Sequence, residues 1–171
     1  NVPLKLYGAG TDSGTFDFFS EAINGRARQH RTDYSATEDD NVTVAGVAGE
    51  RGGMGYFGLS YYEANTSRLK LLEVDGGDGC VAPSRETVEN GTYPLGRPLY
   101  LYVNVGSGER PEVADFVDFV LSADNIARLP SLGLLPAQEA SYALNEYNWS
   151  QRTTGRTFSS PPVELAEGTR L

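Results

Sequence analysis

The sequence contains one cysteine, Cys80, and one histidine, His30, among 171 residues. A single thiol cannot form an intrachain disulfide, and one thiol with one imidazole is too few ligands for a Cys/His zinc site. No apolar run approaches the roughly 20 residues that a membrane-spanning helix needs. A disulfide-stapled scaffold and a zinc-binding module of this kind are therefore excluded.

Basic residues are also scarce. Lysine and arginine total 14 against 23 aspartates and glutamates, which gives a formal net charge of −9. This balance disfavours nucleic acids and anionic membranes as binding partners, because both bind basic protein surfaces. It does not disfavour a small bound anion, since surface charge is screened within about 8–10 Å and local donors decide binding in a dehydrated pocket. The length fits one domain or two small lobes.

A glycine-rich turn connects a short apolar strand to a helical pattern in residues 4–23. The turn contains Gly10, and apolar residues recur at helical spacing from Phe16. A helix start presents unpaired N–H groups and a partial positive charge, and the hydroxyls of Ser13 and Thr15 flank the Gly14 amide there. This pattern predicts a small oxyanion at Ser13–Thr15, although an ordinary helix N-cap explains it as well.

Two enzymatic interpretations of this turn are weaker. A Walker A loop needs a lysine before its Ser/Thr, whereas Gly14 precedes Thr15 here, so nucleotide hydrolysis is not expected. A serine hydrolase needs a base against Ser13, and His30 is the sole imidazole. The spacing around Ser13 also differs from Gly-x-Ser-x-Gly. We expect no catalysis, no cofactor and no metal, with a serine-dependent hydrolase as the less favoured alternative.

Other segments give a coarse outline of the chain. Residues 35–41 resemble a helix start, and we prefer this interpretation of the acidic triplet 38–40 to a metal site. Residues 99–105 are apolar and aromatic on both faces and predict a strand. Helical patterns follow in residues 112–121 and 139–149, and residues 151–171 are predicted to form a surface tail.

Several motifs together resemble one family. The sequence Gly-Thr-Asp-Ser-Gly-Thr-Phe-Asp at residues 10–17 is similar to the phosphate loop of the phosphate-binding proteins that feed ABC phosphate transporters. Each further match is short, but all occur in one order up to residue 155. They are residues 34–41, 46–49, 55–58 with 61–62, 81–84, 91–95, 97–99 and 152–155.

The resemblance implies a type II periplasmic-binding-protein fold, an α/β lobe with a mixed sheet flanked by helices. Residues 1–98 would be the second ligand-binding lobe. Residues 99–150 would hold the crossover strand and the C-terminal helices that pack on the first lobe, and residues 151–171 the tail. Nothing here resembles the family's N-terminal half, which carries another phosphate loop and an acidic partner for the phosphate proton. We therefore expect a C-terminal half, with the first half supplied by another chain, a swapped dimer or a missing part.

By the same resemblance, Ser13, Gly14 and Thr15 would bind inorganic phosphate for an ABC permease. The location would be periplasmic or otherwise extracytoplasmic, with membrane anchoring through a missing N-terminal part as a further option. Many family members carry an arginine shortly before Ser-Gly-Thr, where this chain has Ala9 to Thr11. Arg31 is the candidate substitute, and Asp12 the candidate acceptor for a phosphate proton. The main alternative is an orphan interaction module that has lost the ligand.

Overall fold

The computed structural model describes residues 2–155, which fall into two compact units divided between Gly96 and Arg97. We describe each unit by itself. Within the described residues, no helix combines the length and the apolar character that crossing a membrane demands.

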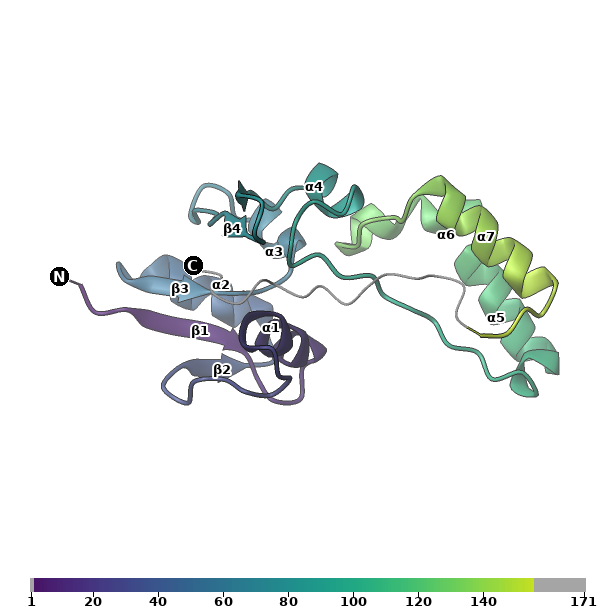
Figure 1. Ribbon diagram of the computed structural model, residues 1–171, viewed down its shortest axis with the longest axis horizontal. Coiled ribbons are helices and arrows are strands. Elements are labelled where there is room, and N and C mark those ends of the chain that lie inside the picture. The colour runs from purple at the N-terminus through teal and green to yellow at the C-terminus, as the bar shows by residue number, and fades with distance from the viewer. Residues whose placement is uncertain (1, 156–171) are drawn as a thin grey trace. The chain divides into compact units, whose positions relative to one another are not determined.

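A parallel three-stranded sheet forms the centre of the first unit (Figure 1). β1 (Lys5–Ala9) lies between β2 (Ser35–Thr37) and β3 (Gly53–Gly55). In the register, Tyr7 is opposite Ser35 on one side and Gly55 on the other. Helices α1 (Gly14–Asn24) and α2 (Asp40–Gly49) connect the strands in βαβ order. The sheet and its helices confirm the predicted α/β lobe.

The helices bury a small core against this sheet. Ala9 on β1, Phe16 on α1 and Val44 on α2 are each less than 5% exposed. A Cβ atom at Gly46 of α2 would collide with the ring of Tyr7, so the glycine lets α2 approach β1 closely. Two polar residues, Ser20 and Thr43, are completely buried in the same core.

The start of α2 corrects one expectation. Residues 35–41 are predicted to begin a helix, but Ser35–Thr37 form β2 and the helix begins only at Asp40. Asp39 is the N-cap, and its carboxylate accepts the N–H of Asn41 at 2.9 Å. Residues 35–37 are extended because they pair with β1, and this pairing satisfies their backbone N–H and C=O groups.

Smaller elements complete the first unit. A short helix, α3 (Leu59–Glu63), is followed by a two-stranded hairpin of β4 (Val74–Asp75) and β5 (Cys80–Val81). Helix α4 (Arg85–Glu89) begins with a capping box, in which Ser84 and Thr87 satisfy each other's backbone N–H groups.

The regular elements in the described part of the second unit are all helices. They are η1 (Ser107–Glu109), α5 (Pro111–Leu121), α6 (Ala123–Ile126), η2 (Leu129–Leu132) and α7 (Glu139–Ser150). Val117 of α5 is buried. The indole N–H of Trp149 on α7 donates to the Asp118 carboxylate at 2.6 Å, and the Arg152 guanidinium lies 3.5 Å from the centre of the Trp149 ring.

The predicted strand at residues 99–105 is wrong for this structure. Residues 97–104 form neither helix nor strand, and Leu99 and Tyr102 are 71% and 88% exposed. A strand needs a neighbour to complete its backbone hydrogen bonds, and the described part of the second unit contains no other strand. The apolar pattern is therefore present without the sheet it would join. Most of the predicted tail, residues 156–171, lies outside the described residues.

Candidate functional site

The turn of residues 10–13 lies at one edge of the parallel sheet. It follows the carboxyl end of β1, Glu38 follows β2, and Tyr56 follows β3. The carboxyl ends of parallel strands meet at the same edge, and ligands of open α/β sheets bind there. The Gly10 N–H donates to the Thr37 carbonyl at 3.1 Å and ties the first two of these segments together. The topology thus places the predicted oxyanion turn where α/β lobes bind ligands.

Ser13 is the N-cap of α1. Its hydroxyl oxygen accepts the N–H of Thr15 at 3.1 Å, and its own N–H donates to the Gly10 carbonyl at 3.1 Å. Ser13 and Thr15 are half-buried, while Asp12 and Gly14 are exposed. Because a hydroxyl that accepts one hydrogen bond still has a proton to donate, capping does not use up the Ser13 side chain. Asp12, Ser13, Gly14 and Thr15 therefore form one accessible set of polar groups.

Arg31 is held elsewhere. Its guanidinium forms a bidentate pair with the Asp33 carboxylate at 2.8 and 2.6 Å, and about two thirds of each side chain is exposed. The hydrogen bond from Arg31 holds the pKa of Asp33 below its usual range. Two nitrogens of the Arg31 guanidinium, Nε and Nη2, are therefore engaged by Asp33.

A different arginine contacts the turn. The Arg28 guanidinium donates to the Thr11 carbonyl at 3.0 Å and lies 3.7 Å from the Asp17 carboxylate. Its backbone has φ 64°, in the left-handed region, and its N–H donates to the buried Ser20 hydroxyl at 2.7 Å. The sequence has a second arginine, Arg26, two positions before Arg28, and the residue pattern alone could not separate the two.

Glu38 is the second contact that sequence reasoning missed. Its carboxylate accepts the N–H of Asp12 at 3.3 Å and occupies the space where a side chain on Gly10 would lie. Within the sequence, Glu38 belongs to an acidic triplet that indicates a helix start. Its position beside the turn follows from the pairing of β2 with β1 and has no local signature.

Aromatic rings pack behind the turn. The Tyr34 hydroxyl donates to the Ala9 carbonyl at 3.0 Å, and Tyr56 stacks on Phe19 of α1 with ring centres 3.8 Å apart and planes 5° apart. The Tyr56 hydroxyl is buried and forms no hydrogen bond to a described residue. Burial, with a smaller contribution from the nearby Tyr34, raises its pKa to about 12. These rings fix the end of β1 and the first turns of α1.

The histidine is part of this aromatic packing. The His30 ring lies 5.4 Å from Phe16 and 4.4 Å from Tyr34 between centres, and its Nδ1 is 3.0 Å from the Arg31 carbonyl oxygen. These contacts give the His30 ring a packing role beside Phe16 and Tyr34.

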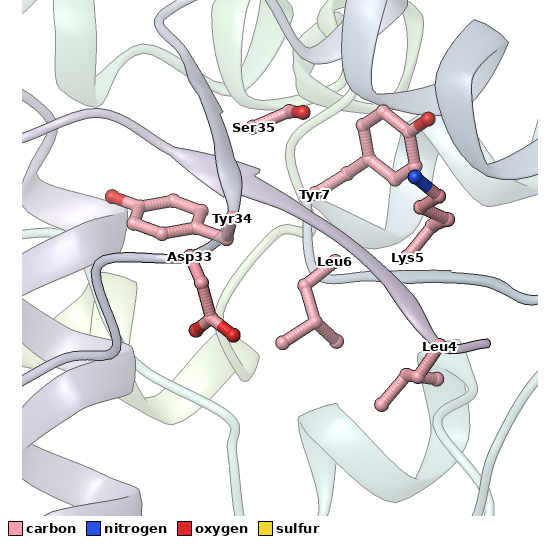
Figure 2. Close-up of a pocket in the computed structure, with 7 residues that line it drawn as sticks. All are labelled: Leu4, Lys5, Leu6, Tyr7, Asp33, Tyr34 and Ser35. Atoms are coloured by element: carbon pink, nitrogen blue, oxygen red, sulfur yellow. The ribbon is translucent and has the colours of Figure 1, made fainter.

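The first unit also contains a cavity of about 320 Å³ along β1 (Figure 2). Figure 2 shows Leu4 and Leu6 pointing to one side of the strand and Lys5 and Tyr7 to the other, as the alternation of a strand requires. None of the predicted oxyanion ligands lines it. The lining residues are Leu4, Lys5, Leu6, Tyr7, Asp33, Tyr34 and Ser35.

Comparison with known proteins identifies relatives of this chain. Residues 1–124 match the PBP superfamily domain. The chain is 43% identical to Protein SphX of Synechocystis, over 94% of this chain and 48% of that protein. It is 35% identical to the phosphate-binding protein PstS of Staphylococcus saprophyticus, over 69% of this chain and 37% of that protein.

A solved structure agrees with these sequence relatives. The crystal structure of a possible phosphate binding protein from Planctomyces limnophilus matches with a TM-score of 0.76 and 37% identity, over 89% of this chain and 55% of that one. The chain thus spans about half the length of the relatives it matches. The predicted periplasmic-binding-protein fold is confirmed, and this chain belongs to the PBP superfamily.

Proposed function

We propose that this chain is part of a solute-binding protein that captures inorganic phosphate for an ABC transporter, outside the cytoplasm and without catalysis. The observation that carries the proposal is the accessible turn at the start of α1. It presents hydroxyl and amide groups and contains no lysine, in a chain related to proteins named for phosphate binding. Neutral donors at a helix start can orient and hold an oxyanion, which supports capture of the anion.

We assign the anion to Ser13, Gly14 and Thr15, with Asp12 beside them. For the cationic partner we place Arg28 ahead of Arg31, because Arg28 already contacts the turn at Thr11 whereas Arg31 is paired with Asp33. A helix start stabilises an adjacent negative charge by about 0.3–1 kcal/mol. Phosphate therefore needs the hydroxyls and a guanidinium in addition to the helix.

We further propose that the rest of the family fold covers the second unit, within the same protein, from another chain or in a swapped dimer. In this view residues 1–98 form the second lobe, and residues 99–150 belong to the first. The support is a set of apolar side chains that are more than half exposed, which a soluble surface rarely gathers without a partner. They are Leu99, Tyr100, Leu101, Tyr102, Val105, Phe116, Phe119, Leu132 and Tyr147.

Calorimetric titration of the intact protein with phosphate tests the function. Ser13→Asp is the informative variant, because aspartate keeps a good N-cap while its charge repels a bound anion. We expect phosphate affinity to fall at least about tenfold, the effect of one like charge near a protein surface. Ser84→Asp makes the same change at the N-cap of α4 and should leave affinity unchanged.

The alternatives predict other results. An interaction module without a ligand gives no heat with phosphate even for the wild-type protein. A serine-dependent hydrolase turns over phosphate esters and loses that turnover in Ser13→Ala. Phosphate binding by the wild type that Ser13→Asp leaves intact would move the site away from α1.

A further inference from the structure

One peptide group of the turn is held from both ends. The Thr11 carbonyl accepts the Arg28 guanidinium at 3.0 Å, and the Asp12 N–H donates to the Glu38 carboxylate at 3.3 Å. This carbonyl and this N–H belong to the same peptide bond. A cation on the oxygen and an anion on the N–H both favour one orientation of the peptide dipole, in which the N–H faces negative charge.

Both holding residues are themselves fixed by the fold. Arg28 reaches the turn because its backbone takes a left-handed conformation that the buried Ser20 hydroxyl supports through a 2.7 Å hydrogen bond. Glu38 reaches it because β2 pairs with β1 and the Gly10 N–H binds the Thr37 carbonyl. The absence of a side chain on Gly10 leaves the space that the carboxylate fills.

The Glu38 carboxylate therefore occupies a position at the turn that a bound anion could take. Its oxygen bonds an N–H of the turn that we propose binds phosphate, and its charge has the same sign as phosphate. Two anions cannot share this N–H without strong repulsion. Bound phosphate either displaces the carboxylate or binds against its field.

We propose that Glu38 is a built-in competitor for the oxyanion at the Asp12 amide and sets the affinity of the site. This inference rests on the proposed phosphate-binding function. In the phosphate-free protein, Glu38 keeps the Thr11–Asp12 peptide in the orientation that an anion requires. When phosphate binds, it takes the place of the Glu38 carboxylate as the anionic partner of the Asp12 N–H. The turn then needs no rearrangement, but the affinity for phosphate is lower than the donors alone would give.

The test is Glu38→Gln in the intact protein, titrated with inorganic phosphate in a calorimeter. Glutamine keeps the size and a hydrogen-bond acceptor but removes the charge, so we expect phosphate to bind about tenfold more tightly. Glu50→Gln removes one negative charge from the same unit away from the turn and should change the affinity less than twofold. Glu38→Ala removes the same negative charge and should also strengthen phosphate binding.

The outcomes separate the two proposals. If the wild type binds phosphate and Glu38→Gln binds it equally or more weakly, the competitor role is refuted while phosphate binding stands. If neither the wild type nor any Glu38 variant binds phosphate, the proposed function itself fails. The amide proton of Asp12 gives a second measurement by NMR: without phosphate, Glu38→Gln should shift it and Glu50→Gln should not, and an unmoved signal would contradict the contact.

Discussion

Ser20 supports the geometry of the candidate site, and its removal has a calculable effect. The side chain is completely buried, donates to the Asp17 carbonyl at 3.1 Å and accepts the N–H of Arg28 at 2.7 Å. Ser20→Ala removes the hydrogen bond to the Arg28 N–H, and a bond of this kind contributes about 0.5–1.5 kcal/mol. The left-handed backbone of Arg28 also loses the contact that holds it. We expect the free energy of unfolding of the first unit to fall by this amount.

Two measurements check this expectation. Urea unfolding, followed by circular dichroism, reports the loss of stability, and hydrogen exchange localises it, because the Arg28 amide should exchange faster in Ser20→Ala. Ser67→Ala is the control, since Ser67 is exposed and such substitutions usually change stability by less than about 0.5 kcal/mol. Wild-type stability together with unchanged exchange at Arg28 would refute the assigned role of Ser20.

Two further predictions concern buried or paired titratable groups. Tyr56→Phe should raise stability by about 1 kcal/mol at neutral pH, because it removes a buried hydroxyl without a hydrogen bond and keeps the stack on Phe19. Since the pKa of Tyr56 is raised to about 12, the wild type should lose stability as pH rises above 10, and a Tyr56→Phe melting curve with the same alkaline slope would contradict this. The hydrogen bond from Arg85 lowers the pKa of Glu63, so that pair stabilises the fold above the ordinary carboxyl pKa of about 4.3 and its contribution is lost as pH falls below it. Thermal melts between pH 3 and 6 should be less pH-dependent for Glu63→Gln, and equal slopes would show that the pair does not couple to folding.

Local sequence determined the elements that depend on neighbouring residues. The cap at Ser13 uses the amide of Thr15, two positions away, and the C-cap of α1 is Gly25, with φ 71°. The capping box of Ser84 and Thr87 spans three positions. Such interactions form within one turn of helix, so a residue pattern is enough to predict them. The α/β fold class follows from the family resemblance, and the position of the candidate turn at residues 10–13 follows from the strand-to-helix pattern of residues 4–23.

Only the tertiary structure decided which distant residues meet the turn. Arg28 and Glu38 reach the Thr11–Asp12 peptide across 17 and 26 positions. Their contacts depend on a left-handed residue and on strand pairing, neither of which has a signature in the nearby sequence. The apolar run 99–105 shows the converse, because it has a strand pattern but no neighbouring strand in the described residues of its unit. A side-chain pattern indicates which secondary structure a segment prefers. Backbone pairing and long-range contacts also require a partner segment, and only the folded chain brings that partner close.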